Sequence, residues 1–111
     1  QRFKNQYHIA HTTDQLDGEF TLFRDAKNNR HYLAFRDMEG GIRESMLQGE
    51  EWAMTKPSEL ASAPQAKGDP IGWADANTGA RHYLYQGKNA TVHQLSYDGK
   101  WTHQALSPKA E

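Results

Sequence analysis

The phrase Arg30-His31-Tyr32-Leu33 occurs twice in the chain, and its second copy is Arg81-His82-Tyr83-Leu84, which starts 51 residues after the first. A polar turn with Gly, an apolar-led strand pattern, a second Gly turn and a Trp follow each copy. A period near fifty residues is typical of a unit that buries its apolar face only against further copies of itself. The sequence therefore predicts two repeated units that pack side by side.

Short runs rich in aromatic and β-branched residues alternate with polar turns in both units, which is the pattern of antiparallel strands. The predicted strands are 19–23, 30–36 and 42–47 in the first unit, and 71–74, 81–86, 91–97 and 101–106 in the second. Asp98-Gly99 between the last two strands is a strong hairpin signal. Four short antiparallel strands in about fifty residues describe a blade of a β-propeller.

This reading divides the chain into five segments. They are an N-terminal segment with an extra strand (1–18), a first blade (19–56), a linker with at most one helical turn (57–69), a second blade (70–107) and a tail (108–111). Two blades cannot close a ring, which takes about four to eight. We therefore expect several chains around one axis, and three chains would give six blades. A small β-sandwich or barrel made by one chain is the alternative, which explains the strands but not the repeat.

Composition limits the classes of partner. Apolar residues make up 36% of the chain and the mean hydropathy is −0.97, so we expect another chain to complete the core. The thirteen Lys and Arg residues are dispersed and the net charge is −1, which argues against nucleic acid. No apolar run approaches the roughly 20 residues that span a bilayer. The chain has no cysteine for a disulfide or a thiolate metal site.

The first unit resembles a blade of the fungal fucose-specific lectins, the Aleuria aurantia lectin-like β-propellers, which include two-blade trimeric relatives. The resemblance rests on residues 32–37, the turn 38–41, the run Ile42-Arg43-Glu44-Ser45 and Trp52, and the second unit ends similarly at residues 92–101. It covers residues 20–107. It implies an all-β propeller with two four-stranded blades per chain and a ring completed by oligomerisation. It also implies a secreted or extracellular protein, with the cytoplasm as the other expectation.

In that family fucose lies between adjacent blades and is held by an Arg, a Glu and an aromatic residue of the next blade. The resemblance assigns the Glu to Glu44 and the aromatic residue to Trp101. Arg and Glu present donors and acceptors to sugar hydroxyls, and an aromatic face packs on the C–H patch of the ring. Tyr32 occupies the Arg position, which departs from the family pattern.

In the second repeat the matching positions hold Tyr83 and Gln94, with Trp52 of a neighbouring chain as the aromatic residue. Both family arginines are therefore missing. Arg30 and Arg81 lie two residues before the two tyrosines, and side chains at i and i+2 share one face of a strand. These two arginines are candidates to reach a relocated sugar site.

Each of these residues also has a purely structural reading. Trp52, Trp73 and Trp101 could pack in the core, because large aromatic side chains dominate small β cores. Glu44 could be a solvated carboxylate, and each arginine a solvated charge at the start of a strand.

We expect neither an enzyme nor a cofactor. The sequence has no Gly-x-Ser-x-Gly, no P-loop and no GxGxxG turn. His8 and His11 would point to opposite faces of a strand, and His31 and His82 occupy repeated positions, so we expect no metal site.

Two functions follow. The first is a lectin-like protein that binds glycans or glycoproteins at blade seams as a homo-oligomer, with several weak sites acting by avidity. The second is a lectin-like propeller without sugar binding that serves as a protein–protein interaction module or secreted effector.

Overall fold

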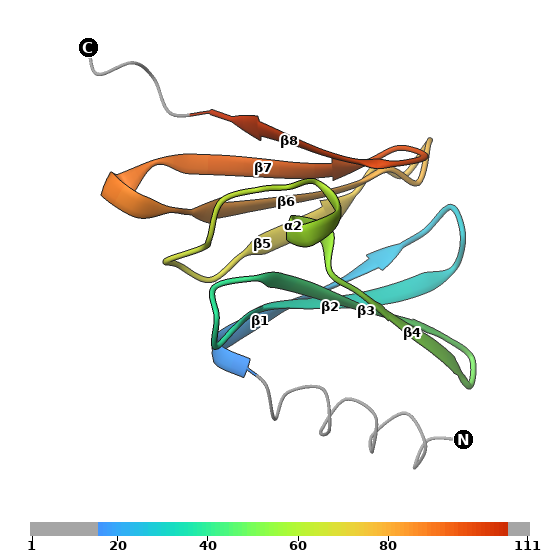
Figure 1. The fold of residues 1–111 in the computed structure, drawn as a ribbon. Coiled ribbons are helices and arrows are strands. Elements are labelled where there is room, and N and C mark those ends of the chain that lie inside the picture. Colours follow the sequence, from blue (N-terminus) through green and yellow to red (C-terminus); the bar gives the residue numbers. More distant parts are fainter. Residues whose placement is uncertain (1–15, 107–111) are drawn as a thin grey trace.

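The computed structural model describes residues 16–106, which form two four-stranded antiparallel sheets stacked as layers (Figure 1). Sheet A has the order β1-β2-β3-β4, and sheet B has the order β5-β6-β7-β8. The strands are β1 (Leu16–Asp25), β2 (Arg30–Asp37), β3 (Ile42–Gln48), β4 (Glu51–Thr55), β5 (Ile71–Ala74), β6 (Arg81–Gln86), β7 (Val92–Tyr97) and β8 (Trp101–Ala105). The prediction of an all-β chain with two four-stranded units is confirmed, and this part of one chain forms no closed ring.

Aspartates shape the first turn of each sheet. The Asp25 carboxylate accepts hydrogen bonds from the backbone N–H groups of Lys27 and Asn28, at 3.0 and 3.3 Å. Asp75 closes the corresponding turn of sheet B in the same way, with backbone donors at 2.7 and 3.0 Å. An Asp side chain that captures the backbone two or three residues on mimics a turn, which is why these polar runs end one strand and start the next.

The core lies between the two sheets. Ala34 and Ile42 of sheet A pack against Tyr83, Tyr85 and Leu95 of sheet B, and all five are buried. Their side chains occupy one face of each sheet, as the two-residue period of a strand requires. We call this contact the seam.

The linker between the sheets covers one side of the seam (Figure 1). It carries one helical turn, α2 (Pro57–Leu60), as predicted, and a short 3₁₀ turn, η1 (Lys88–Ala90), lies between β6 and β7. The Ser58 hydroxyl accepts a hydrogen bond from the Ile42 backbone N–H at 2.9 Å, and the Tyr85 hydroxyl donates to the Pro64 carbonyl at 2.8 Å. The segment predicted to add an N-terminal strand lies outside the described residues up to residue 15.

The closest approach of the two sheets is at Gly72 on β5, which lies against β1. A Cβ at this position would lie 2.5 Å from the Tyr83 ring and 2.8 Å from the Phe23 ring. We therefore expect Gly72→Ala to lower the free energy of unfolding by about 1–3 kcal/mol, because these packed rings have no room to move. Urea unfolding measures this. Gly68→Ala, whose Cβ would meet only the Gln86 side chain at 3.3 Å, is the control, and equal losses in both variants would contradict the packing.

Candidate functional site

The two sheets repeat with a step of 50 residues, whereas the repeated phrase has a step of 51. Ala34 pairs with Glu44 in sheet A, and Leu84 pairs with Gln94 in sheet B. Each pair across β2–β3 has such a counterpart 50 residues later across β6–β7. The two Arg-His-Tyr-Leu phrases are therefore one residue out of step in the structure, although Glu44 and Gln94 are equivalent as predicted.

This one-residue difference decides which way the tyrosines point. The structural counterpart of Tyr32 is His82, and that of Tyr83 is Leu33. A shift of one residue moves a side chain to the other face of its sheet. As a result Tyr32 and Tyr83 do not occupy equivalent places in two successive seams but meet in the same one.

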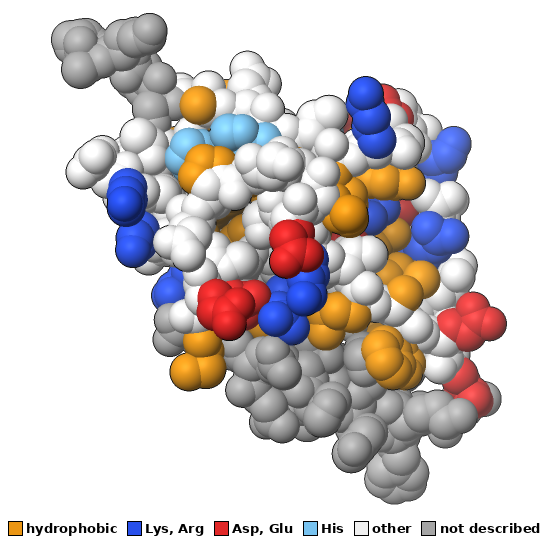
Figure 2. Space-filling model, viewed as in Figure 1, with side chains coloured by type: hydrophobic (Ala, Val, Ile, Leu, Met, Phe, Trp, Pro, Cys, Tyr) orange, Lys and Arg blue, Asp and Glu red, His pale blue; other side chains and the backbone are white. Residues whose placement is uncertain are grey.

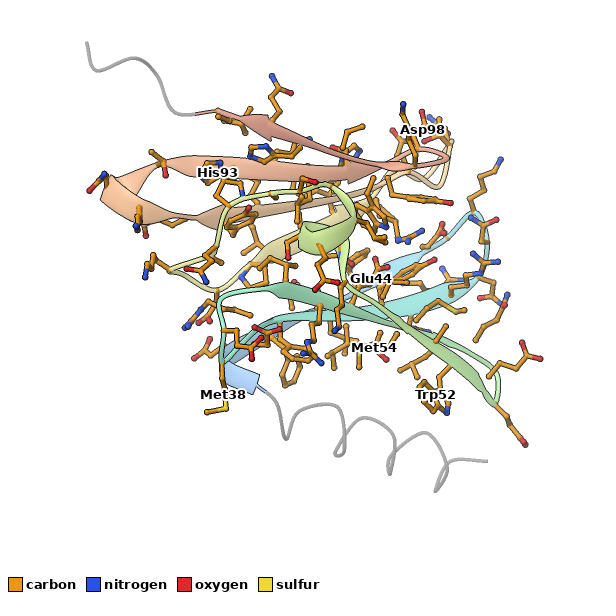
Figure 3. The ribbon with its side chains drawn as sticks, viewed as in Figure 1. Met38, Glu44, Trp52, Met54, His93 and Asp98 are labelled. Carbon is orange, nitrogen blue, oxygen red and sulfur yellow. The ribbon has the colours of Figure 1, made fainter. Side chains whose placement is uncertain are left out.

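Glu44 is the centre of that seam. Its side chain points from β3 toward sheet B (Figure 3), and the residue is 1% exposed. Arg81 donates to both carboxylate oxygens, from Nε to Oε2 at 2.7 Å and from Nη2 to Oε1 at 2.9 Å. The Tyr83 hydroxyl donates to Oε2 at 2.5 Å, and the Thr55 hydroxyl donates to Oε1 at 3.1 Å. This carboxylate therefore accepts four hydrogen bonds, two of them from sheet B in the bidentate geometry that Arg favours.

Aromatic rings enclose the Arg81 guanidinium. Its Cζ lies 4.3 Å from the Tyr32 ring centroid, 4.6 Å from that of Tyr97 and 5.3 Å from that of Trp101. A cation over aromatic faces is attracted to their negative π-clouds, and the attraction grows when water is excluded. Trp101 also stacks on Tyr83 with centroids 6.0 Å apart. Five of the eight predicted sugar-binding residues thus converge: Tyr32, Glu44, Arg81, Tyr83 and Trp101.

The electrostatics of this cluster favour the ion pair. Burial would lower the pKa of Arg81, but its hydrogen bonds to Glu44 and the charge of that carboxylate outweigh burial and raise it. Burial raises the pKa of Tyr83 well above its usual value, and the Glu44 charge raises it further. Tyr83 therefore stays a neutral donor at physiological pH. The arrangement joins the two sheets through satisfied partners, and its geometry is that of a structural fastening.

The other three predicted residues lie elsewhere. Arg30 is near the cluster, with Nη1 3.5 Å from the Tyr32 hydroxyl, and its buried Nε has no hydrogen-bond partner. Trp52 lies on the face of sheet A directed away from the seam (Figure 3) and is 51% exposed. Gln94 points to the opposite face of sheet B from Tyr83, because its cross-strand partner is Leu84.

Gln94 belongs to a second cluster, on the face of sheet B that points away from sheet A. We call it the outer face. Trp73 stacks on His82 there, with ring centroids 5.3 Å apart. The Gln94 amide donates to the Ser96 hydroxyl at 3.0 Å and lies 3.3 Å from His82 Nδ1. Our sequence reasoning assigned no binding role to Trp73, His82 or Ser96. Aligning the repeats on Glu44 and Gln94 instead of the repeated phrase would have placed all three beside Gln94.

The outer face of sheet B carries no formal charge. Its described strand positions are Ile71, Trp73, His82, Leu84, Gln86, Val92, Gln94, Ser96, Thr102 and Gln104. None is Asp, Glu, Lys or Arg, although such residues make up 24% of the chain. Trp73 is 41% exposed and Ile71 is 59% exposed. Depletion of charge together with aromatic exposure is typical of the centre of a binding interface.

A polar cavity of about 270 Å³ lies between the β2–β3 turn and the linker. Its lining includes Asp37, Glu39, Lys56 and Gln65. Asp37 is already held by the Arg43 Nε at 2.7 Å and by the backbone N–H groups of residues 39 and 41. Burial would raise the pKa of Asp37, but these hydrogen bonds together lower it, so the carboxylate serves the turn.

Comparison of the chain with protein-family models, curated proteins and solved structures found no match. Among residues 16–106, no group of three or more His, Cys, Asp or Glu side chains is arranged to hold a metal ion. Within the same range, no helix has the length and apolar character needed to cross a membrane. The argument for function therefore rests on the two clusters.

Glu44→Gln leaves the Arg81 cation buried with a neutral partner. We expect this variant to lose about 3–5 kcal/mol of unfolding free energy, as when one member of a buried ion pair is removed. The double variant Glu44→Leu/Arg81→Met should lose less than the sum of its two single variants, because no charge is then left alone. Urea unfolding of the set measures the coupling.

The control for the ion-pair set is Asp69→Asn, which removes the partly exposed pair of Asp69 with Arg36 at 3.3 Å. Such pairs contribute about 0–1 kcal/mol. Strictly additive losses for Glu44 and Arg81 would show that the pair does not join the sheets.

Proposed function

We propose that this protein is a non-enzymatic, lectin-like carbohydrate-binding protein that binds sugar on the outer face of sheet B. The observation that carries the proposal is the exposed Trp73 ring beside the uncharged polar side chains of His82, Gln94 and Ser96. An aromatic face packs on the C–H patch of a sugar ring, while amide, hydroxyl and imidazole groups exchange hydrogen bonds with its hydroxyls. Gln94 offers both a donor and an acceptor for this purpose.

The repeat supports the choice of this face over the seam. Phe23, Tyr32 and Glu44 of sheet A face sheet B, and their counterparts 50 residues later are Trp73, His82 and Gln94. The first set is closed by Arg81, whereas the second set faces outward. Gln94 in place of Glu44 needs no cation as its partner, so a neutral ligand suits this position.

A neighbouring copy completes the proposed site. Trp52 is the counterpart of Trp101, because Leu47 pairs with Trp52 and Tyr97 pairs with Trp101. A copy that offers sheet A to the outer face of sheet B would bring its own Trp52 to the edge of the sugar site. Repetition of that contact around an axis gives a ring, and three chains give six blades.

A glycan array tests the site. We expect fucosylated or other neutral glycans to bind the full chain, and Trp73→Ala to reduce the signal at least tenfold through loss of the stacking platform. Gln94→Ala should weaken binding by a smaller factor. Leu60→Ala is the matched control, since Leu60 is an exposed apolar residue on α2, away from the outer face. Circular dichroism confirms that each variant is folded.

The second candidate function is a protein-interaction module, and the closed Glu44–Arg81 pair together with exposed Ile71 and Val92 favours it. It predicts no glycan signal from the intact assembly. Absence of binding across the array, in protein whose variants are folded, would overturn the carbohydrate proposal in favour of this one.

Light scattering tests the ring. The proposal predicts a mass near three times that of the 12.6 kDa chain. Ile71→Lys should shift this mass toward one chain, because it puts a charge on the uncharged outer face. A monodisperse single chain at high concentration would contradict the ring.

A further inference from the structure

Two histidines share a hydrogen bond at the edge of sheet B. His93 Nδ1 on β7 lies 2.9 Å from His103 Nε2 on β8, and the ring centroids are 5.0 Å apart. Figure 2 shows imidazole side chains gathered on the visible face over these two strands, and Figure 3 labels His93 there. The pair is separate from the cluster around Gln94, because His93 points to the seam face of sheet B and Gln94 to the outer face.

Neighbouring hydrogen bonds fix the proton positions of His93. The Thr91 hydroxyl donates its one hydrogen to the Lys88 carbonyl at 2.7 Å, so it can only accept from His93 Nε2, which is 3.1 Å away. His93 Nε2 therefore carries a hydrogen. In a neutral ring Nδ1 is then the acceptor, and His103 Nε2 must donate to it.

This arrangement can hold one positive charge but not two. Protonation of His103 leaves its Nε2–H donor in place, whereas protonation of His93 Nδ1 removes the acceptor and sets two N–H groups against each other. We propose that the His93–His103 pair is an acid-sensitive latch that holds the edge strand β8 on sheet B. Its opening releases β8 from β7 and exposes a strand edge, which is a ready site for pairing with another chain.

The surroundings give a second charge no compensation. The Tyr85 ring of β6 lies over His93 with centroids 5.3 Å apart, and Gly87 approaches so closely that a Cβ there would be 2.8 Å from His93 Nε2. Lys88 adds a cation to the lining of the adjacent cavity, and the linker faces it with uncharged Pro64 and Gln65. Among the described residues, neither imidazole of the pair has a carboxylate as a hydrogen-bond partner.

The direction of the pH dependence follows. Burial lowers the pKa of His93, and the neighbouring His103 lowers it further. The unfolded chain therefore binds the proton more readily than the folded one. The stability from this pair is complete above the ordinary histidine pKa of about 6.5 and is lost as the pH falls through the lower pKa of the folded state.

The test is urea unfolding of the full chain at several pH values between about 7.5 and 5. His93→Asn keeps an acceptor oxygen near the Nδ1 position but does not titrate in this range. We expect the unfolding equilibrium constant of the unmodified chain to rise at least threefold more on acidification than that of His93→Asn. His31→Gln, which removes an exposed histidine of β2, should behave like the unmodified chain.

NMR of the imidazole nitrogens gives an independent readout that needs no variant. The latch predicts the Nε2–H form of His93 at neutral pH and a midpoint of protonation below that of His31. An Nδ1–H form of His93, or an equal acid response in the unmodified chain and His93→Asn, would overturn the proposal.

Discussion

The buried carboxylate of Glu44 is the constraint on which this structure depends. A charge that is 1% exposed is stable only when it is paired and fully hydrogen-bonded, and both bidentate partners come from Arg81 on the other sheet. Sheet A and sheet B therefore cannot separate, or slide by one residue, without leaving a bare charge in the core. Rings of Tyr32, Tyr97 and Trp101 shield the guanidinium from water and fix its place.

The same constraint makes two similar sheets unequal. Sheet A uses Glu44 to bind sheet B, and sheet B has Gln94 at the equivalent place on an outward, uncharged face. The repeated position thus supplies a permanent contact in one sheet and an open surface in the other. Carbohydrate binding is the proposal that best uses the polar atoms on that surface, and the histidine latch lies on the opposite face of the same sheet.

Much of the fold could be predicted from the sequence, because alternation and turn residues act locally. The turns at Asp25 and Asp75 and the helical turn after Lys56 are examples. The site was harder. The repeated phrase suggested that Tyr32 and Tyr83 are equivalent, but cross-strand register is set by packing over both faces, and it differs by one residue from the phrase. That slip brought five predicted residues into one seam and left Trp73 unassigned.

The most direct measurement of the central claim is the NMR signal of the Arg81 Nε–H group. A guanidinium held between Glu44 and three aromatic rings predicts a sharp Nε–H resonance at neutral pH, protected from exchange with water and shifted by the nearby ring faces. The protection should persist until the two sheets unfold together. An Arg81 Nε–H that exchanges as fast as that of exposed Arg24 would contradict the account.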